Sequence, residues 1–188
     1  AAPTWSPDGK TLAVTLSRKD GDVVVYTLNL SSQVLTRMTF DPGIDTEPSW
    51  SSDGKKLYFM SDRAGGPQIY EVDVSDPKRP TRVSFEGNYN ARPRVSPDGK
   101  QLAVVHLDRG NYRIAVIDIA SKGLQVLSEG RQDESPSFAP NGAVLIYATQ
   151  EKGRGVLATV STDGRTAERF TNTSGEVREP VWAPFPQR

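Results

Sequence analysis

The sequence predicts an all-β fold, a β-propeller of four-stranded antiparallel blades, because one cluster of residues recurs at a nearly constant interval. In each repeat a proline is followed by an aromatic or aliphatic residue, by Ser or Ala, and then in most repeats by a turn of the Pro-Asp-Gly-Lys type. The leading prolines are Pro3, Pro48, Pro93, Pro136 and Pro180, at intervals of 43 to 45 residues. Such an interval is the length of one propeller blade. We therefore expect a single propeller region over 1–188, with repeats at 3–47, 48–92, 93–135 and 136–179 and a terminal inner strand at 180–184.

Within a repeat, alternating apolar residues and turn residues predict four strands, here called A to D from the inside outward. In the second repeat strand A is expected at 48–51, strand B at 56–61, strand C at 68–74 and strand D at 81–85. The same order fits the other three repeats. Strand B is apolar on both faces, as in Lys56–Met60 and Gln101–Val105. This pattern predicts a strand that is covered on both sides by neighbouring blades.

The recurring Asp-Gly pair lies in the turn between strands A and B. An Asp or Asn side chain can accept a hydrogen bond from the backbone N–H two residues later, and Gly tolerates a positive φ. We therefore interpret Asp8, Asp53, Asp98 and Asn141 as structural residues rather than metal ligands. The aromatic residues of the repeat are likewise expected to pack between blades rather than to stack on a ligand; they are Trp5, Trp50, Phe138 and Trp182.

Composition excludes several classes of function. The chain has 23 Lys and Arg residues against 23 Asp and Glu residues, so its net charge gives no attraction to nucleic acid or to an anionic membrane. No apolar run is long enough to cross a bilayer, and no cysteine is available for a disulfide or a thiolate metal site. We expect no nucleic-acid partner and no membrane insertion, while cytoplasm and periplasm both remain open.

The repeats supply five A strands but only four sets of strands B, C and D. An A strand at Pro3 and another at Pro180 would compete for one position if four blades closed into a ring. The sequence therefore predicts an arc of a larger propeller. Open edges are templates for pairing, so self-association is expected.

One face of the predicted propeller is acidic. The connections from strand D to the next strand A are expected at 41–47, 86–92, 129–135 and 173–179, and together they carry nine acidic residues and three arginines. With the B-to-C turns they surround the mouth of the propeller, the end of its central channel on that face. This charge suits a basic or cation-bearing partner. The alternative is that these carboxylates are solvated and only oppose aggregation.

An enzyme is not favoured by the sequence. There is no Gly-x-Ser-x-Gly elbow, and the only histidine, His106, falls in a predicted B strand. Gly153-Arg154-Gly155 matches a dinucleotide fingerprint in letters, but it precedes a predicted strand rather than a helix. No catalytic residue, metal or cofactor is expected, although several carboxylates at the mouth leave a bound Ca²⁺ open. The alternative function is the propeller domain of a prolyl-oligopeptidase-like peptidase, or of a periplasmic sensor, separated from its catalytic domain.

Three segments resemble the C-terminal propeller of the TolB family, and the resemblance runs the length of the chain. They are Glu47–Lys55, Asp133–Gly142 and, at the C-terminal end, Val160–Arg165 with Glu179–Pro184. The resemblance implies a periplasmic component of the Tol–Pal system, in which a six-bladed propeller follows an N-terminal α/β domain. In this family the propeller mouth binds the peptidoglycan-associated lipoprotein Pal, and bacteriocins dock on the same propeller. The chain lacks that N-terminal domain and about the first blade and a half, so contact with TolA is not expected.

The resemblance also implies a site. Residues just before the strand-A proline contact Pal in this family, and they correspond to Ala2 and Thr46. Geometry alone adds neighbouring mouth positions, namely Asp45, Glu47, Ala91, Arg92, Glu134 and Ser135. The resulting prediction is a non-enzymatic scaffold that binds Pal, maintains the outer membrane, supports cell division and serves in bacteriocin import.

Overall fold

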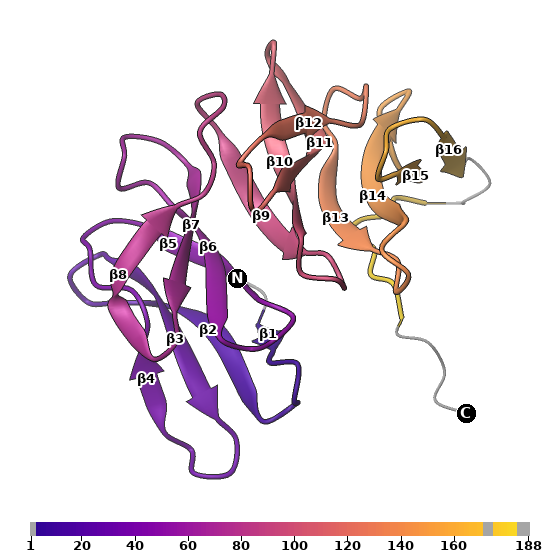
Figure 1. Ribbon diagram of the computed structural model, residues 1–188. Helices are drawn as coiled ribbons and strands as arrows, with labels where there is room; N and C mark the ends of the chain where they lie inside the picture. Colours follow the sequence, from indigo (N-terminus) through magenta and orange to yellow (C-terminus); the bar gives the residue numbers. More distant parts are fainter. Residues whose placement is uncertain (1–2, 171–174, 184–188) are drawn as a thin grey trace, which may run out of the picture. The chain divides into compact units, whose positions relative to one another are not determined.

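The computed structural model describes residues 3–170 and 175–183, and in these ranges its strands form four four-stranded antiparallel sheets. Each sheet is a meander in which consecutive strands pair, as Figure 1 shows. The first sheet contains β1 (Thr4–Trp5), β2 (Thr11–Ser17), β3 (Val23–Asn29) and β4 (Leu35–Arg37), and the second β5 (Asp45–Trp50), β6 (Lys56–Ser61), β7 (Gln68–Asp73) and β8 (Asp76–Arg82). The third contains β9 (Asn90–Val95), β10 (Gln101–Asp108), β11 (Asn111–Asp118) and β12 (Leu124–Val126). The fourth contains β13 (Glu134–Phe138), β14 (Val144–Glu151), β15 (Arg154–Ser161) and β16 (Ala167–Phe170). The predicted all-β propeller of four-stranded blades is confirmed.

The chain divides into two compact units, Ala1–Val95 and Ser96–Arg188. In the first unit β5 packs on β2 and β3, and β9 packs on β5, β6 and β7. In the second unit β13 packs on β10 and β11. The described residues include no helix that could span a bilayer.

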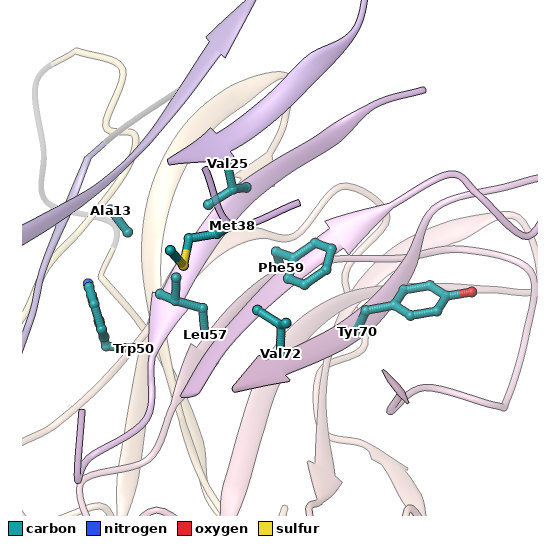
Figure 2. Packing of buried hydrophobic residues seen from close by; sticks show 8 residues of the cluster. All are labelled: Ala13, Val25, Met38, Trp50, Leu57, Phe59, Tyr70 and Val72. Atoms are coloured by element: carbon teal, nitrogen blue, oxygen red, sulfur yellow. The ribbon is translucent and has the colours of Figure 1, made fainter. Parts of the chain in front are cut away.

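An apolar cluster joins the first two sheets inside the first unit, and Figure 2 shows its packing. Ala13, Val25 and Met38 come from the first sheet and its β4 end, and the other members come from the second sheet. Those others are Trp50, Leu57, Phe59, Tyr70 and Val72. The predicted B strands supply its centre, because Leu57 and Phe59 are fully buried. Neighbouring blades of this unit therefore share one buried apolar cluster.

The A-to-B turns have the predicted geometry. The backbone N–H two residues after each Asp or Asn donates to its side-chain oxygen at 3.0 or 3.1 Å in all four repeats. The following glycine has a φ between 70° and 72° in every case. A serine two residues before the acid adds a hydrogen bond to Asp8, Asp53 and Asp98 at 2.6 Å each. This hydrogen bond, with the turn N–H, lowers the pKa of these carboxyls below their usual range.

Two strands of the second repeat start earlier than predicted. The second outer strand, β8, runs over Asp76–Arg82 and not 81–85, although it contains Pro77 and Pro80. Strand β8 pairs only with β7, so a proline nitrogen that faces outward removes no ladder hydrogen bond. Strand β5 begins at Asp45, three residues before the predicted start, because its pairing with β6 continues through a bulge between Thr46 and Ser49.

The repeated aromatic residues do not all pack as expected. Trp50 and Phe138 are buried, and the Trp50 indole N–H donates to the Thr4 carbonyl at 3.3 Å. Trp5 is 60% exposed and Trp182 is 39% exposed, so the prediction of buried packing is wrong for these two. Trp5 lies on the first described sheet and Trp182 follows the last, so neither is covered on both sides by described strands as Trp50 is.

The segment predicted as a terminal inner strand, 180–184, is described only as far as Ala183, and its described part belongs to no sheet. The Trp182 N–H nevertheless donates to the Ser137 hydroxyl at 3.2 Å. Two repeats earlier, the Val95 N–H makes the same kind of bond to the Ser49 hydroxyl at 3.4 Å. A serine after the strand-A proline thus bonds to the corresponding segment of the next repeat in both units.

Candidate partner-binding face

The β4–β5 connection is held on both sides by the turns of adjacent blades. From the first blade, the Val23 N–H donates to the Gly43 carbonyl at 3.0 Å, and Asp22 accepts from the Gly43 N–H at 3.1 Å. From the second blade, Asp62 accepts from the Ile44 N–H at 2.9 Å and donates its own N–H to the Ile44 carbonyl at 3.2 Å. Ile44 therefore has a fully bonded backbone and a side chain that remains 44% exposed.

Arg63, in the turn between β6 and β7, also holds the same connection, and its side-chain contacts with that connection form the Arg63 clamp. Its guanidinium forms ion pairs with Asp41 and with Asp45, the latter at 3.1 Å. Its Nε donates to the Ser61 hydroxyl at 2.8 Å, and the guanidinium lies over the Tyr70 and Phe59 rings at 4.8 and 5.4 Å from their centroids. The Arg63 side chain is only 14% exposed. Sequence reasoning missed both Arg63 and Ile44, because these contacts join separate turns.

A left-handed residue precedes the strand-A proline in four repeats. Glu47, Arg92, Ser135 and Glu179 have φ values of 57°, 54°, 56° and 52°. Non-glycine residues rarely adopt this conformation, and it is found most often where the surrounding structure enforces it. In the first unit two of these residues are joined, because the Glu47 carboxylate accepts a hydrogen bond from the Arg92 N–H at 2.7 Å. The Arg92 guanidinium also lies 3.5 Å from the other Glu47 oxygen.

The predicted site residues of the first unit fall into two groups. Asp45 is 2% exposed and Ala91 is 3% exposed, so both support the backbone from inside. Thr46 is half-buried, and the side chains of Glu47 and Arg92 are 26% and 32% exposed. Only this second group is accessible to a partner.

In the second unit Glu134 is half-buried and Ser135 is 7% exposed. Both lie on β13 at a bulge between Glu134 and Ser137, which corresponds to the bulge in β5. Ala2 lies outside the described residues. The structure thus brings Asp45, Thr46, Glu47, Ala91 and Arg92 together in one unit and places Glu134 and Ser135 in the other.

The acidic excess of these connections is partly compensated. Asp41 and Asp45 pair with Arg63, Glu47 pairs with Arg92, and Glu176 pairs with Arg178 at 3.1 Å. Asp45 and Asp133 are buried and present no charge to a partner. The expected attraction for a basic partner is correspondingly smaller than the count of nine acids suggests.

A buried Asp or Asn stands three residues before the strand-A proline in three repeats. These residues are Asp45, Asn90 and Asp133, all at most 2% exposed. Asn90 donates to Gln68 at 3.0 Å and to the Glu86 carbonyl at 2.9 Å, while Asp133 accepts from Ser128 and from the Gly130 N–H. The pattern Asp/Asn-x-x-Pro is present in the sequence, but the expectation that Asp45 and Asp133 contribute charge to the mouth did not include their burial.

The other sequence motifs have structural explanations. His106 is 6% exposed and lies within β10, where it was predicted. Gly155 is the second residue of β15, and a Cβ there would lie 2.8 Å from the Val177 carbonyl oxygen. A close backbone approach therefore explains this glycine without a bound phosphate. Among the described residues, no group of three or more His, Cys, Asp or Glu side chains could hold a metal ion.

Comparison with known proteins gives consistent matches. The model of the TolB beta propeller domain family matches residues 1–186. A Tol-Pal system protein TolB from Ruthia magnifica subsp. Calyptogena magnifica is 57% identical over 185 residues, which cover 98% of this chain and 43% of that protein. The crystal structure of TolB from Acinetobacter baumannii superposes with a TM-score of 0.90 at 46% identity, covering 97% of this chain and 46% of the other. A putative TolB from Agrobacterium tumefaciens, with a TM-score of 0.79 at 21% identity, covers 88% of this chain and 62% of that one and shares the fold.

The chain thus spans less than half the length of the two relatives that it resembles at high identity. The family model, by contrast, extends over nearly all of it. This chain belongs to the TolB beta propeller domain family.

Proposed function

We propose that this chain is a non-enzymatic, partner-binding propeller segment of the Tol–Pal envelope system, and that its partner is the lipoprotein Pal. The observation that carries the proposal is the 57% identity to a Tol-Pal system protein TolB over 98% of the chain. A periplasmic location, a role in outer-membrane integrity and cell division, and docking of bacteriocins are parts of the same proposal.

The proposed contact surface in the first unit consists of Thr46, Glu47, Arg92 and the exposed Ile44. Three features support it. Its backbone is fixed by hydrogen bonds from two turns, its left-handed residues Glu47 and Arg92 are joined by a hydrogen bond, and its side chains remain accessible. A rigid surface loses little conformational entropy on binding, which favours affinity.

The proposed absence of catalysis is supported by the state of the candidate acid–base groups. His106 is buried inside a strand, where its imidazole is remote from solvent. Burial raises the pKa of Tyr147 to about 12, so this phenol stays protonated and is a poor general base near neutral pH.

The test is calorimetric titration of this chain with the soluble domain of Pal, using Thr46→Arg and Thr36→Arg as a matched pair. Thr46 is at the proposed surface, whereas Thr36 lies exposed on the outer strand β4 of the same unit. We expect saturable binding that Thr46→Arg weakens at least tenfold and Thr36→Arg leaves unchanged. Failure of this chain to bind, where a longer TolB protein binds, would mean that the site needs segments outside it. Failure of both would refute the proposed function.

A further inference from the structure

The Arg63 guanidinium connects parts of the first unit that are distant in sequence. It reaches Asp41, 22 residues away, and Asp45, 18 residues away, while its Nε donates to Ser61 at the end of β6. The Tyr70 and Phe59 rings lie against its plane and hold it in place. A guanidinium is a planar cation that can bind acceptors at two positions while it stacks on an aromatic ring, and the ammonium group of lysine cannot do this.

Arginines of the other turns between second and third strands behave differently. Arg18 pairs with Asp20 inside its own turn, and Arg109 is 90% exposed beside the adjacent Asp108. In the described part of the chain, Arg63 is the turn arginine that forms ion pairs with a connection leading into an inner strand. The clamp is therefore a feature of the β4–β5 connection and not a general feature of the repeat.

The clamped segment leads directly into the proposed contact surface. Asp45 is followed by Thr46 and Glu47, and Thr46 is the last paired residue before the bulge in β5. The Asp45 side chain is 3% exposed, and its Oδ2 has no hydrogen-bond partner within the described structure. Arg63 is thus the cation that compensates this buried carboxylate, and its removal would favour rearrangement of the segment.

We propose that Arg63 is a positioning residue for partner binding, because it fixes the β4–β5 connection in the conformation that displays Ile44 and Thr46. This inference rests on the proposed function. If only a fraction of molecules holds the competent conformation, the apparent dissociation constant rises in inverse proportion to that fraction. Loss of the clamp therefore weakens binding although Arg63, 14% exposed, need not touch the partner.

The experiment compares Arg63→Met, Arg63→Lys and Arg82→Met with the unchanged chain. Arg82 is the matched control, because it also lies over an aromatic ring, that of Phe85 at 5.4 Å, and donates to a carbonyl at 2.6 Å without contacting the β4–β5 connection. Two quantities are measured at a temperature where circular dichroism shows each variant folded. They are the affinity for the soluble domain of Pal and the hydrogen-exchange rates of the Gly43 and Ile44 amides.

We expect Arg63→Met to weaken binding at least tenfold and to raise both exchange rates by a similar factor. Arg63→Lys should fall between Arg63→Met and the unchanged chain, and Arg82→Met should match the unchanged chain in both measurements. Wild-type affinity in Arg63→Met, or an equal loss in Arg82→Met, would overturn the inference. If the unchanged chain does not bind Pal, the proposed function fails, and unaltered exchange at Gly43 and Ile44 in Arg63→Met would then refute the clamp separately. If Arg63→Met does not fold, Asp41→Asn replaces it, since Asp41 is half exposed and its loss leaves no buried charge.

Discussion

The carboxylate of Glu47 accepts a hydrogen bond from the backbone N–H of Arg92 at 2.7 Å, and this bond joins equivalent positions of two successive blades, 45 residues apart. Both residues are left-handed and both precede a proline. A hydrogen bond to an ionised group is stronger than one between neutral groups. The bond thus joins the left-handed backbone of Arg92, in one inner strand, to the side chain of Glu47, in the preceding inner strand.

Replacement of Glu47 by Ala should therefore destabilise the chain. The loss of one charge-assisted, partly buried hydrogen bond predicts a decrease of about 1–2 kcal/mol in the free energy of unfolding. Urea denaturation monitored by circular dichroism measures this quantity. Glu47→Gln keeps an acceptor oxygen at the same distance from the backbone and should lose less stability than Glu47→Ala. An unchanged stability in Glu47→Ala would show that the hydrogen bond to Arg92 contributes nothing.

The hydrogen bond from Ser96 to Asp98 should control the titration of that carboxyl group. It is the largest cause of the lowered pKa of Asp98, so Ser96→Ala should raise this pKa toward its ordinary value. Because folding lowers this pKa, the carboxylate stabilises the chain at pH values above its ordinary pKa. This contribution to stability is lost as the pH falls through the pKa of the folded state. Ser96→Ala should consequently be less stable than the unchanged chain near neutral pH. Its stability should then fall less than that of the unchanged chain as the pH is lowered.

The measurement is an NMR titration of the Asp98 side-chain carboxyl carbon. Ser51→Ala provides the control, because it removes the corresponding hydrogen bond from Asp53 in the other unit. An Asp98 pKa that is the same in Ser96→Ala as in the unchanged chain would contradict the assigned cause.

Local rules made the A-to-B turns and the B strands predictable. The turn requires an Asx acceptor at one position and a glycine at the next, so four residues determine it. The B strand is apolar on both faces over five or more residues, which few other environments produce. Residues such as Asp53, Gly54 and Leu57 therefore took the predicted roles.

The inner-strand starts and the Arg63 clamp were not predictable in this way. Strand β5 continues through Glu47, which has a left-handed backbone and whose carboxylate accepts a hydrogen bond from the next repeat. The ion pairs of Arg63 join residues 18 and 22 positions apart, and nothing in the local sequence distinguishes this arginine from Arg109. Such features depend on tertiary contacts, which override local preference at the positions that matter for the site.

Gly130 should be intolerant of any side chain for a purely steric reason. A Cβ at this position would lie 1.8 Å from Asp133 Oδ1, and the backbone there is not left-handed. Gly130→Ala must displace the buried Asp133 carboxylate from Ser128 and from the Gly130 N–H. We expect a decrease of about 2–3 kcal/mol in the free energy of unfolding, from the buried charge left with fewer partners.

Thermal or urea unfolding of Gly130→Ala measures this decrease, and Gly123→Ala serves as the control. At Gly123 the nearest atom to an added Cβ is the Ser121 hydroxyl at 3.5 Å, an ordinary contact distance, and the backbone is again not left-handed. Gly123→Ala should remain within about 0.5 kcal/mol of the unchanged chain. Similar stability in the two variants would mean that Asp133 has space to move.

Asn90 should not be replaceable by Asp, although Asp45 and Asp133 occupy the equivalent positions. Asn90 is fully buried, and its amide donates to Gln68 Oε1 at 3.0 Å and to the Glu86 carbonyl at 2.9 Å. A carboxylate at this position would face two acceptor oxygens and could donate to neither unless protonated. Asn90→Asp should therefore lower the free energy of unfolding by about 2–3 kcal/mol or more at pH 7.

The pH dependence of this loss follows from the sign of the pKa change. Burial next to acceptors disfavours the charged form, so the pKa of an Asp at position 90 is raised by folding. The folded variant then binds a proton more tightly than the unfolded one, and its stability relative to the unchanged chain rises as the pH is lowered from 7 toward 4.5. Asn29→Asp is the control, because Asn29 Oδ1 only accepts hydrogen bonds, from the N–H groups of Ser31 and Ser32 and from the Ser32 hydroxyl. Urea denaturation at the two pH values should show that Asn90→Asp lowers the free energy of unfolding less at pH 4.5 than at pH 7, and that Asn29→Asp does not lower it in this way. If Asn90→Asp lowers the free energy of unfolding equally at both pH values, the shape of the side chain and not its charge decides this position.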